Sequence, residues 1–351
     1  MRKLTLLCPT FNRHRYLERS CRFWSRHDVN VIYADGSESA YAGSCIDSPN
    51  IHYIHRSASV QQRCIEMLNI VATPYSCMIS DDEFFIPSAL KSCVDFLEMN
   101  PDYSSCMGRS IGFSVRNGEI TFRNQYPLLQ GRELSDEDKL TRLEKHFASY
   151  VPAHCYSVVR SEIFLSSMKR AWSSELDVFA IGELIEEFLI ISAGKSVVLP
   201  MLYWLRSHEV PPVQSLSDIG LDRSKVFSNW WQDAVTHSER DTFCSDLSLA
   251  TSPSIEKAQV MHIFDLYVQR SYRRQAMVIG FPLLRAPLFF LRKFISLFRL
   301  LKSSCLGFAN RFFSPMLHGE RALQELRSQG VMIDEDGLAE CLVSIKESLI
   351  F

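Results

Sequence analysis

Apolar runs alternate with amphipathic stretches through the first hundred residues of this chain, and that alternation limits its fold more than any other feature. The apolar runs expected as strands cover residues 4–8, 29–34, 51–54 and 75–79. Between them, apolar side chains recur at helical spacing, which predicts helices over residues 15–24, 59–71 and 88–99. Such alternation is typical of an α/β fold, in which helices cover both faces of a mostly parallel sheet.

The pattern beyond residue 100 predicts further strands and then helices. Short strands are expected between Tyr103 and Phe122, joined by a hairpin turn at residues 116–119. The later expected elements are a polar helical stretch over 131–150, a strand over 153–159, a helix from Ser161, a helix over 181–193 closed by Gly194, an apolar run over 197–204 and helices over 215–275. We therefore expect an α/β unit over residues 1–210, with halves 1–100 and 101–210, and a helical C-terminal region over 211–351.

Polar side chains follow the expected strands where a ligand would bind. Thr10 and Asp35 come after the first two strands, and Ser80-Asp81-Asp82-Glu83 comes after the fourth. Ligands of parallel sheets bind at the carboxyl ends of the strands. Carboxylates there suit Mg²⁺ or Mn²⁺, which prefer oxygen ligands. The alternative is an acidic turn that caps the next helix, because Asp and Glu favour a first helical turn.

The overall composition excludes several classes of protein. A net charge of −2 argues against a nucleic-acid partner. The 11 cysteines include no C-x-x-C pair, so a zinc site or a disulfide framework is not expected and a reducing compartment fits best. The apolar run at the N-terminus is cut by Pro9 and is too short for a signal peptide or a membrane span. We therefore expect a cytoplasmic protein.

One segment departs from this balanced composition. Residues 266–319 contain nine Lys or Arg and no Asp or Glu, and residues 281–302 mix Phe and Leu with spaced cations. Such a pattern suits a helix that lies in the headgroup layer of an anionic membrane. The alternatives are a helix buried against the α/β unit and a contact in a homo-oligomer.

Three short motifs, in this order, resemble those of the GT-A glycosyltransferases of the family-two type. They are Pro9-Thr10-Phe11-Asn12-Arg13, then Ala34-Asp35-Gly36-Ser37, then Ser80-Asp81-Asp82-Glu83-Phe84. The resemblance covers about residues 1–210. It implies a GT-A (Rossmann-like) mixed sheet flanked by helices, with a nucleotide-sugar half and an acceptor half.

The resemblance also implies roles for individual residues around the donor. Those expected to line the nucleotide-sugar are Pro9, Thr10, Asn12, Arg13, Asp35, Arg63, Asp81 and Arg206. Those expected to hold Mn²⁺ or Mg²⁺ are Asp82, Glu83 and His208. Ser80 departs from the family, since it stands where the first acid of the Asp-x-Asp motif is usual. The alternatives are a turn-forming role for Asp35, a solvated helix charge for Arg63 and a surface position for His208.

The catalytic base is expected on the helix over residues 181–193. Family-two relatives place an acid at the start of such a helix, about three turns before a glycine, which selects Glu183. Glu186 and Glu187 follow at one-turn spacing, and either could hold the role instead. The alternative is an ordinary solvated acidic face. His154 is a weaker candidate, for the acceptor pocket or for a strand end.

Together these features predict an inverting, metal-assisted transferase that uses a nucleotide-sugar, most plausibly UDP-linked. The basic apolar segment suggests a glycan or lipid-linked glycan acceptor, made at the inner face of a bacterial membrane. One alternative is a nucleotidyltransferase, although the glycine-rich phosphate loop of those enzymes is missing after the first strand. Another is a non-catalytic scaffold at the membrane surface, built on a decayed transferase domain.

Overall fold

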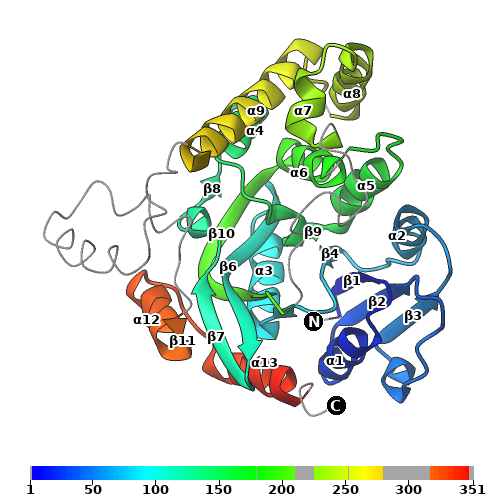
Figure 1. The fold of residues 1–351 in the computed structure, drawn as a ribbon, viewed down its shortest axis with the longest axis vertical. Coiled ribbons are helices and arrows are strands. Elements are labelled where there is room, and N and C mark those ends of the chain that lie inside the picture. The colour runs from blue at the N-terminus through cyan, green and yellow to red at the C-terminus, as the bar shows by residue number, and fades with distance from the viewer. Residues whose placement is uncertain (1, 179, 210–224, 252, 280–316, 348–351) are drawn as a thin grey trace, which may run out of the picture.

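The computed structural model describes residues 2–178, 180–209, 225–251, 253–279 and 317–347 (Figure 1). In these residues, 11 strands form one mixed sheet with the main order β11-β7-β6-β9-β4-β1-β2-β3. The strands are β1 (Leu4–Thr10), β2 (Asn30–Asp35), β3 (Ile51–His55), β4 (Tyr75–Met78), β5 (Phe84–Phe85), β6 (Tyr103–Arg116), β7 (Glu119–Asn124), β8 (Glu133–Leu134), β9 (Val158–Arg160), β10 (Lys195–Ser207) and β11 (Leu317–His318). Helices flank this sheet, as the α/β pattern predicts.

The first four long strands form the parallel part of the sheet. β1 pairs in parallel with β2 and β4, and β2 pairs in parallel with β3. The connecting helices are α1 (His14–Trp24), α2 (Val60–Leu68) and α3 (Pro87–Met99). Successive residues of β1 face opposite sides: Leu6 packs in the core that includes α1 and α3, while Leu7 packs in the core that includes α2. The continuous apolar run of β1 is therefore explained by cover on both faces.

The second part of the sheet is mixed. β6 pairs with β10 in parallel, and with β7 and β9 in antiparallel fashion. The helices on this part are α4 (Lys139–Ala148), α5 (Ser161–Trp172) and α6 (Ile181–Ala193). Two sequence expectations need correction. The polar stretch over 131–150 begins with β8, and the strand expected over 153–159 is a 3-10 turn, η3 (His154–Tyr156), followed by the short β9.

The remaining helices belong to two different cores. Apolar side chains of α7 (Phe227–Gln232), α8 (His237–Ala250) and α9 (Lys257–Ile279) pack with those of α4 and α6. In contrast, α12 (Gly319–Ser328) and α13 (Glu335–Glu347) contribute to the core of the main sheet. Residues 317–347 therefore return to the α/β unit.

Two expectations about membranes are only partly covered by the structure. The basic segment 281–302 lies outside the described residues. Among the helices that are described, none is both long enough and apolar enough to cross a bilayer.

Candidate functional site

Polar residues from three parallel strands meet at the carboxyl edge of the sheet. Thr10 and Asp35 are register partners at the ends of β1 and β2. The hydroxyl of Thr10 donates to Oδ2 of Asp81 at 2.6 Å, which joins the end of β1 to the turn after β4. These contacts bring the residues at the three strand ends together.

Asp35 is fully buried, and both of its carboxylate oxygens have partners. Its Oδ1 accepts from the backbone N–H of Ser37 at 2.8 Å, and its Oδ2 accepts from the hydroxyl of Tyr53 at 2.7 Å. His14 Nε2 lies 3.3 Å from the same Oδ2. Burial opposes ionisation of Asp35, but the hydrogen bonds from Ser37 and Tyr53 prevail and lower its pKa. A nucleobase N–H would therefore have to share an oxygen that already has a protein donor.

Arg63 is neither on the surface nor directed at an open site. Its NH1 donates to the carbonyl of Thr10 at 2.8 Å and to the carbonyl of Ala34 at 2.6 Å. The guanidinium passes so close to Gly36 that a Cβ there would lie 2.5 Å from the Arg63 Cζ. Arg63 therefore satisfies carbonyls at two strand ends, and glycine at position 36 makes room for it.

Arg13 joins the two aspartates of the acidic turn. Its NH1 lies 3.2 Å from Oδ1 of Asp81, and its NH2 lies 2.7 Å from Oδ2 of Asp82. Burial raises the pKa of Asp81 to about 6, against the opposing effects of Arg13 and Thr10. Asn12 precedes Arg13 with a φ of 53°, a left-handed conformation that asparagine tolerates better than most residues. Pro9 lies inside β1, opposite Ala34, and the turn that follows Thr10 delivers Arg13 to the acids.

Glu83, the third acid of the turn, contacts two side chains of β10. Its Oε2 accepts from the indole N–H of Trp204 at 2.9 Å, and its Oε1 lies 3.8 Å from Nε of Arg206. Burial raises the pKa of Glu83 to about 8. Arg206 lies over the rings of Tyr126 and Trp204, which fix the orientation of its guanidinium.

His208 lies at the end of β10, where a metal ligand was expected. Both of its ring nitrogens lie 2.6 Å from NH2 of Arg123, and its Nε2 lies 3.2 Å from Oε1 of Gln125. Burial lowers the pKa of His208 to about 4, so the ring is neutral at physiological pH. Gly112 permits this position, because a Cβ there would lie 2.8 Å from the imidazole.

The three residues expected to hold a metal are not gathered into a metal-binding group. In the described part of the chain, one set of His, Cys, Asp or Glu side chains brings three ligand atoms within 4.8 Å of one another, and it consists of His146, His154 and Glu187. Asp82, Glu83 and His208 instead have arginines beside them. This donor set does not fit a divalent cation as it stands, since guanidinium groups lie where an ion would approach.

The three glutamates of α6 differ in accessibility. Glu183, in the first turn, is exposed, whereas Glu186 and Glu187 are buried on the inner face of the helix. Surrounding protein nevertheless raises the pKa of Glu183 above its ordinary value. Among the described residues, Oε1 of Glu186 has no hydrogen-bond partner, and burial raises the pKa of Glu186 strongly. Glu183 is thus the one of the three that an acceptor from solvent can reach.

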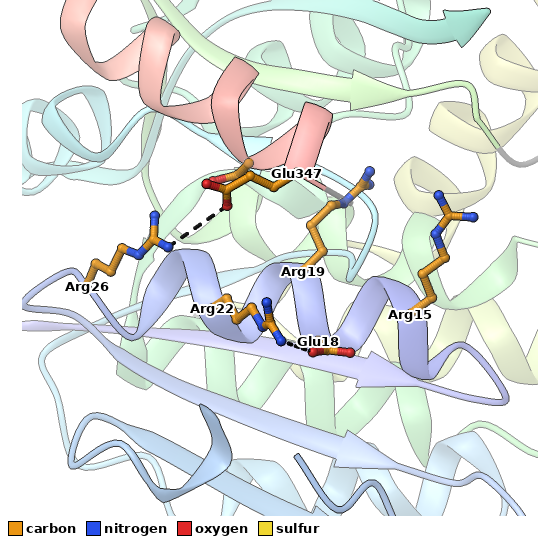
Figure 2. A pocket seen from close by; sticks show the side chains of 7 residues that line it. Arg15, Glu18, Arg19, Arg22, Arg26 and Glu347 are labelled. Atoms are coloured by element: carbon orange, nitrogen blue, oxygen red, sulfur yellow. Dashed lines mark hydrogen bonds and ion pairs between the residues drawn. The ribbon is translucent and has the colours of Figure 1, made fainter. Parts of the chain in front are cut away.

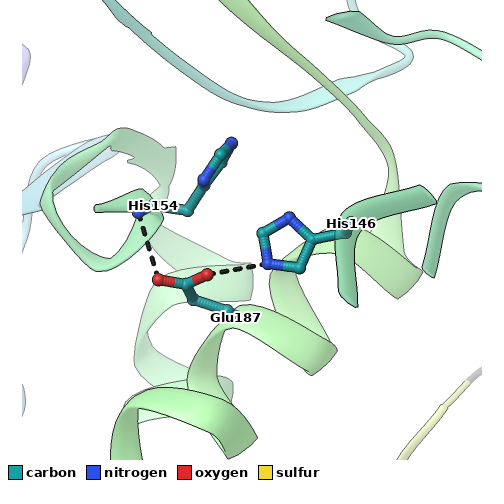
Figure 3. Close-up of side chains that lie close together, drawn as sticks. All are labelled: His146, His154 and Glu187. Carbon is teal, nitrogen blue, oxygen red and sulfur yellow. Dashed lines mark hydrogen bonds and ion pairs between the residues drawn. The ribbon is translucent and has the colours of Figure 1, made fainter. Parts of the chain in front are cut away.

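Glu187 belongs to a buried network of hydrogen-bonded side chains that the sequence did not reveal (Figure 3). Its Oε2 lies 2.7 Å from Nε2 of His146, and its Oε1 accepts from the backbone N–H groups of His154 and Cys155 at 3.1 and 3.4 Å. On the other side of the His146 ring, NH2 of Arg132 lies 3.1 Å from Nδ1. Because these two N–H groups donate to Glu187, they are not available for the inter-strand hydrogen bonds that a strand over residues 153–159 would make.

The contact with Arg132 determines which ring nitrogen of His146 carries the proton, and so whether this buried network could bind a metal. Arginine only donates, so Nδ1 of His146 must accept, and the ring proton is on Nε2, directed at Glu187. A metal at Nε2 would need that proton removed and would replace the hydrogen bond from His146 to Glu187. We therefore interpret Arg132, His146 and Glu187 as a structural relay that holds η3 against α6.

A surface depression lies apart from the strand ends, between α1 and α13 (Figure 2). Its lining residues are Arg15, Glu18, Arg19, Arg22, Arg26, Ser344 and Glu347. Glu18 pairs with Arg22, and Glu347 lies 3.9 Å from Arg26. Arg19 connects the depression to the candidate site, because its NH2 donates to the Asp82 carbonyl at 2.9 Å and pairs with Glu209 at 2.7 Å.

Comparison with known proteins identifies the fold. No family model and no curated protein matches the sequence. The crystal structure of residues 1–349 of TarS from S. aureus has a TM-score of 0.54 and 12% identity, over 84% of this chain and 78% of that one. The structure of TarS 1–349 in complex with UDP-GlcNAc has a TM-score of 0.46 and 12% identity, over 78% of this chain and 92% of that one. A TM-score of 0.46 does not by itself indicate a shared fold, so the fold assignment depends on the first structure.

The first similarity, together with the sheet, defines the class of fold. The chain has a central mixed sheet flanked by helices, and this arrangement is GT-A-like. The fold class expected from the three motifs is therefore confirmed.

Proposed function

We propose that this chain is a glycosyltransferase that moves a sugar from a nucleotide-sugar, UDP-linked in our prediction, to an acceptor hydroxyl. The observation that carries the proposal is the meeting of Thr10, Arg13 and Asp81 at the carboxyl edge of a GT-A-like sheet. That edge is where sheets of this kind bind nucleotides. Fold alone would not suffice, because one fold supports many activities.

Glu183 is the proposed catalytic base. Glu183 is an exposed residue, and desolvation by the surrounding protein raises the pKa of its carboxyl group, which strengthens it as a proton acceptor. The acceptor oxygen attacks the anomeric carbon while its proton passes to Glu183. The bond from that carbon to the diphosphate breaks, and the nucleoside diphosphate leaves with the electron pair. A single displacement of this kind inverts the anomeric centre.

The acceptor and the cellular setting rest on the sequence. The basic apolar composition of residues 266–319 supports a glycan or a lipid-linked glycan of the bacterial surface as acceptor, met at the inner face of the membrane. The Mn²⁺ or Mg²⁺ expected from the sequence is not carried into this proposal, because the acids that would bind it already have arginine partners.

Calorimetric titration of the full chain with UDP-, GDP-, CDP- and TDP-sugars tests the proposal. UDP-GlcNAc, with which TarS 1–349 was crystallised, is a suitable first probe. We expect one donor to bind and to release its nucleoside diphosphate when an acceptor is added. Heat from none of the four would contradict the proposal, and release of pyrophosphate from a nucleoside triphosphate would indicate a nucleotidyltransferase instead.

A further inference from the structure

We propose that this chain binds the diphosphate of its donor through arginine, with the Arg13 guanidinium in place of a divalent cation. The inference deepens the proposed function and depends on it. It concerns the same site, but it changes what neutralises the leaving group.

The first support is the geometry of Arg13. One guanidinium reaches both aspartates, at 3.2 Å from Asp81 and 2.7 Å from Asp82. A divalent ion on the carboxylate oxygens that Arg13 contacts would have to displace this guanidinium and leave its charge in a partly enclosed site. Such unpairing costs several times more than loss of an exposed ion pair.

The second support is the order of exposure. The side chains of Asp81 and Asp82 are 2% and 13% exposed, whereas that of Arg13 is 33% exposed. The neighbouring pair repeats the pattern, with Glu83 at 7% and Arg206 at 32%. An approaching ligand therefore meets the arginine side chains before it meets the carboxylates, and phosphate is the anion that the planar guanidinium fork fits best.

The third support is an unused donor. Among the described residues, Nε of Arg13 is buried and has no hydrogen-bond partner. An unpaired buried N–H costs free energy, so a native site normally provides an acceptor for it. A shift of the guanidinium toward a bound phosphate would bring Nε to an acceptor oxygen, while the acids behind it keep the side chain in the site.

The remaining residue expected to bind a metal has a comparable arrangement. Both ring nitrogens of His208 lie beside NH2 of Arg123. An ion bound to the imidazole would face that positive charge directly. Every acid or imidazole expected to coordinate the metal thus has an arginine within contact distance.

The test measures nucleotide binding with and without metal. Full-length protein, treated with EDTA and dialysed, is titrated with UDP, GDP, CDP and TDP, and the titration is repeated with added Mn²⁺ and then Mg²⁺. We expect one nucleotide to bind with a Kd that changes by less than about twofold on metal addition. Binding that requires Mn²⁺ or Mg²⁺ would overturn this inference and leave the proposed function standing. Binding to no nucleotide in any condition would overturn both.

Variants identify the guanidinium that is responsible. Arg13→Gln should weaken nucleotide binding by about tenfold or more, with or without metal, because charge-assisted hydrogen bonds to phosphate are lost. Arg15→Gln changes an exposed arginine two positions away and should leave binding unchanged. The double variant Arg13→Gln/Asp82→Asn keeps the local charge balanced, so weak binding by this variant as well, with an unchanged melting temperature, excludes simple misfolding. Unaltered binding by the double variant would contradict the role of Arg13.

Discussion

Glu183 differs from Glu186 and Glu187 in accessibility, although all three lie within two turns of one helix. Glu183→Gln should preserve nucleotide-sugar binding and lower the rate of transfer by about 10²–10⁴-fold, since an amide cannot accept the acceptor's proton. Nucleotide release and calorimetry on the same preparation separate the two effects. Glu186→Gln is the matched control, because that side chain is buried and an acceptor from solvent does not reach it. A larger loss of transfer in Glu186→Gln would indicate that Glu186, one turn further along α6, is the base.

Glu83 should make stability depend on pH. Its pKa rises from 4.5 to about 8 on folding, mainly through burial, so the folded protein holds a proton that the unfolded chain releases. The free energy of unfolding should therefore decrease as pH rises from 4.5 to about 8, by at most about 1.4 kcal/mol per pH unit. Urea unfolding across this range measures the slope. Glu83→Gln, which cannot ionise, should flatten it, and an unchanged slope in the variant would contradict this prediction.

Sequence patterns predicted the residue types of the site better than their partners. Thr10, Asp35 and Asp81 were found because each follows an apolar run, and the carboxyl ends of parallel strands meet at one edge. The partners of Arg63 and His146 could not be found in this way. They lie far away in the sequence, at Ala34 and Glu187, and nothing in the local pattern distinguishes a buried arginine or histidine from an exposed one.

At the scale of elements, the relay of Arg132, His146 and Glu187 connects α4, α6 and η3. His146→Ala should reduce the free energy of unfolding by about 1–3 kcal/mol or more, because it leaves a buried carboxylate with one donor fewer. Chemical denaturation measures this loss. Lys145→Ala, on the exposed face of the same helix, should change stability by less than about 0.5 kcal/mol. Stoichiometric zinc in the purified protein, lost in His146→Ala, would contradict the interpretation as a relay.

The same relay explains why one expected element was wrong. Residues 153–159 have the apolar composition of a strand, but Glu187 binds the backbone N–H groups of His154 and Cys155. Only Val158–Arg160 is left to pair with β4 and β6. Local strand propensity predicted the long parallel strands correctly, because the burial of those strands on both faces favours the same apolar residues. It failed at residues 153–159, where a side chain distant in the sequence bonds to the backbone.

At the scale of the whole molecule, residues 317–347 complete the sheet and its core. β11 pairs with β7, and the backbone N–H of Leu202 in β10 donates to the carbonyl of Met332 at 2.8 Å. Ser88 at the start of α3 bonds to Asp334, and His27 after α1 lies 3.2 Å from Glu340. The boundary at residue 210 stays a prediction, but these contacts tie the end of the described chain to its first helices.

Leu338→Ala should therefore destabilise the α/β unit itself. Leu338 lies in the same core as Trp24, so its truncation should cost about 2–5 kcal/mol and shift the whole unfolding transition. Coincident transitions by tryptophan fluorescence and circular dichroism would measure this. Val343→Ala, at a half-exposed position of the same helix, is the control and should have little effect. Separate transitions for α13 and the sheet would contradict a shared core.

The contact between α1 and α13 has a consequence for synthesis on the ribosome. Figure 1 shows the last helix beside the first, although more than three hundred residues separate them in the chain. The edge of β10 that receives Met332, and the face of α1 that receives α13, remain uncovered until residues 317–347 have been synthesised. Nascent chains expose apolar surface in such intervals and attract chaperones or one another. Slow translation of the residues between β10 and β11 should therefore prolong the period in which this protein is most prone to aggregate.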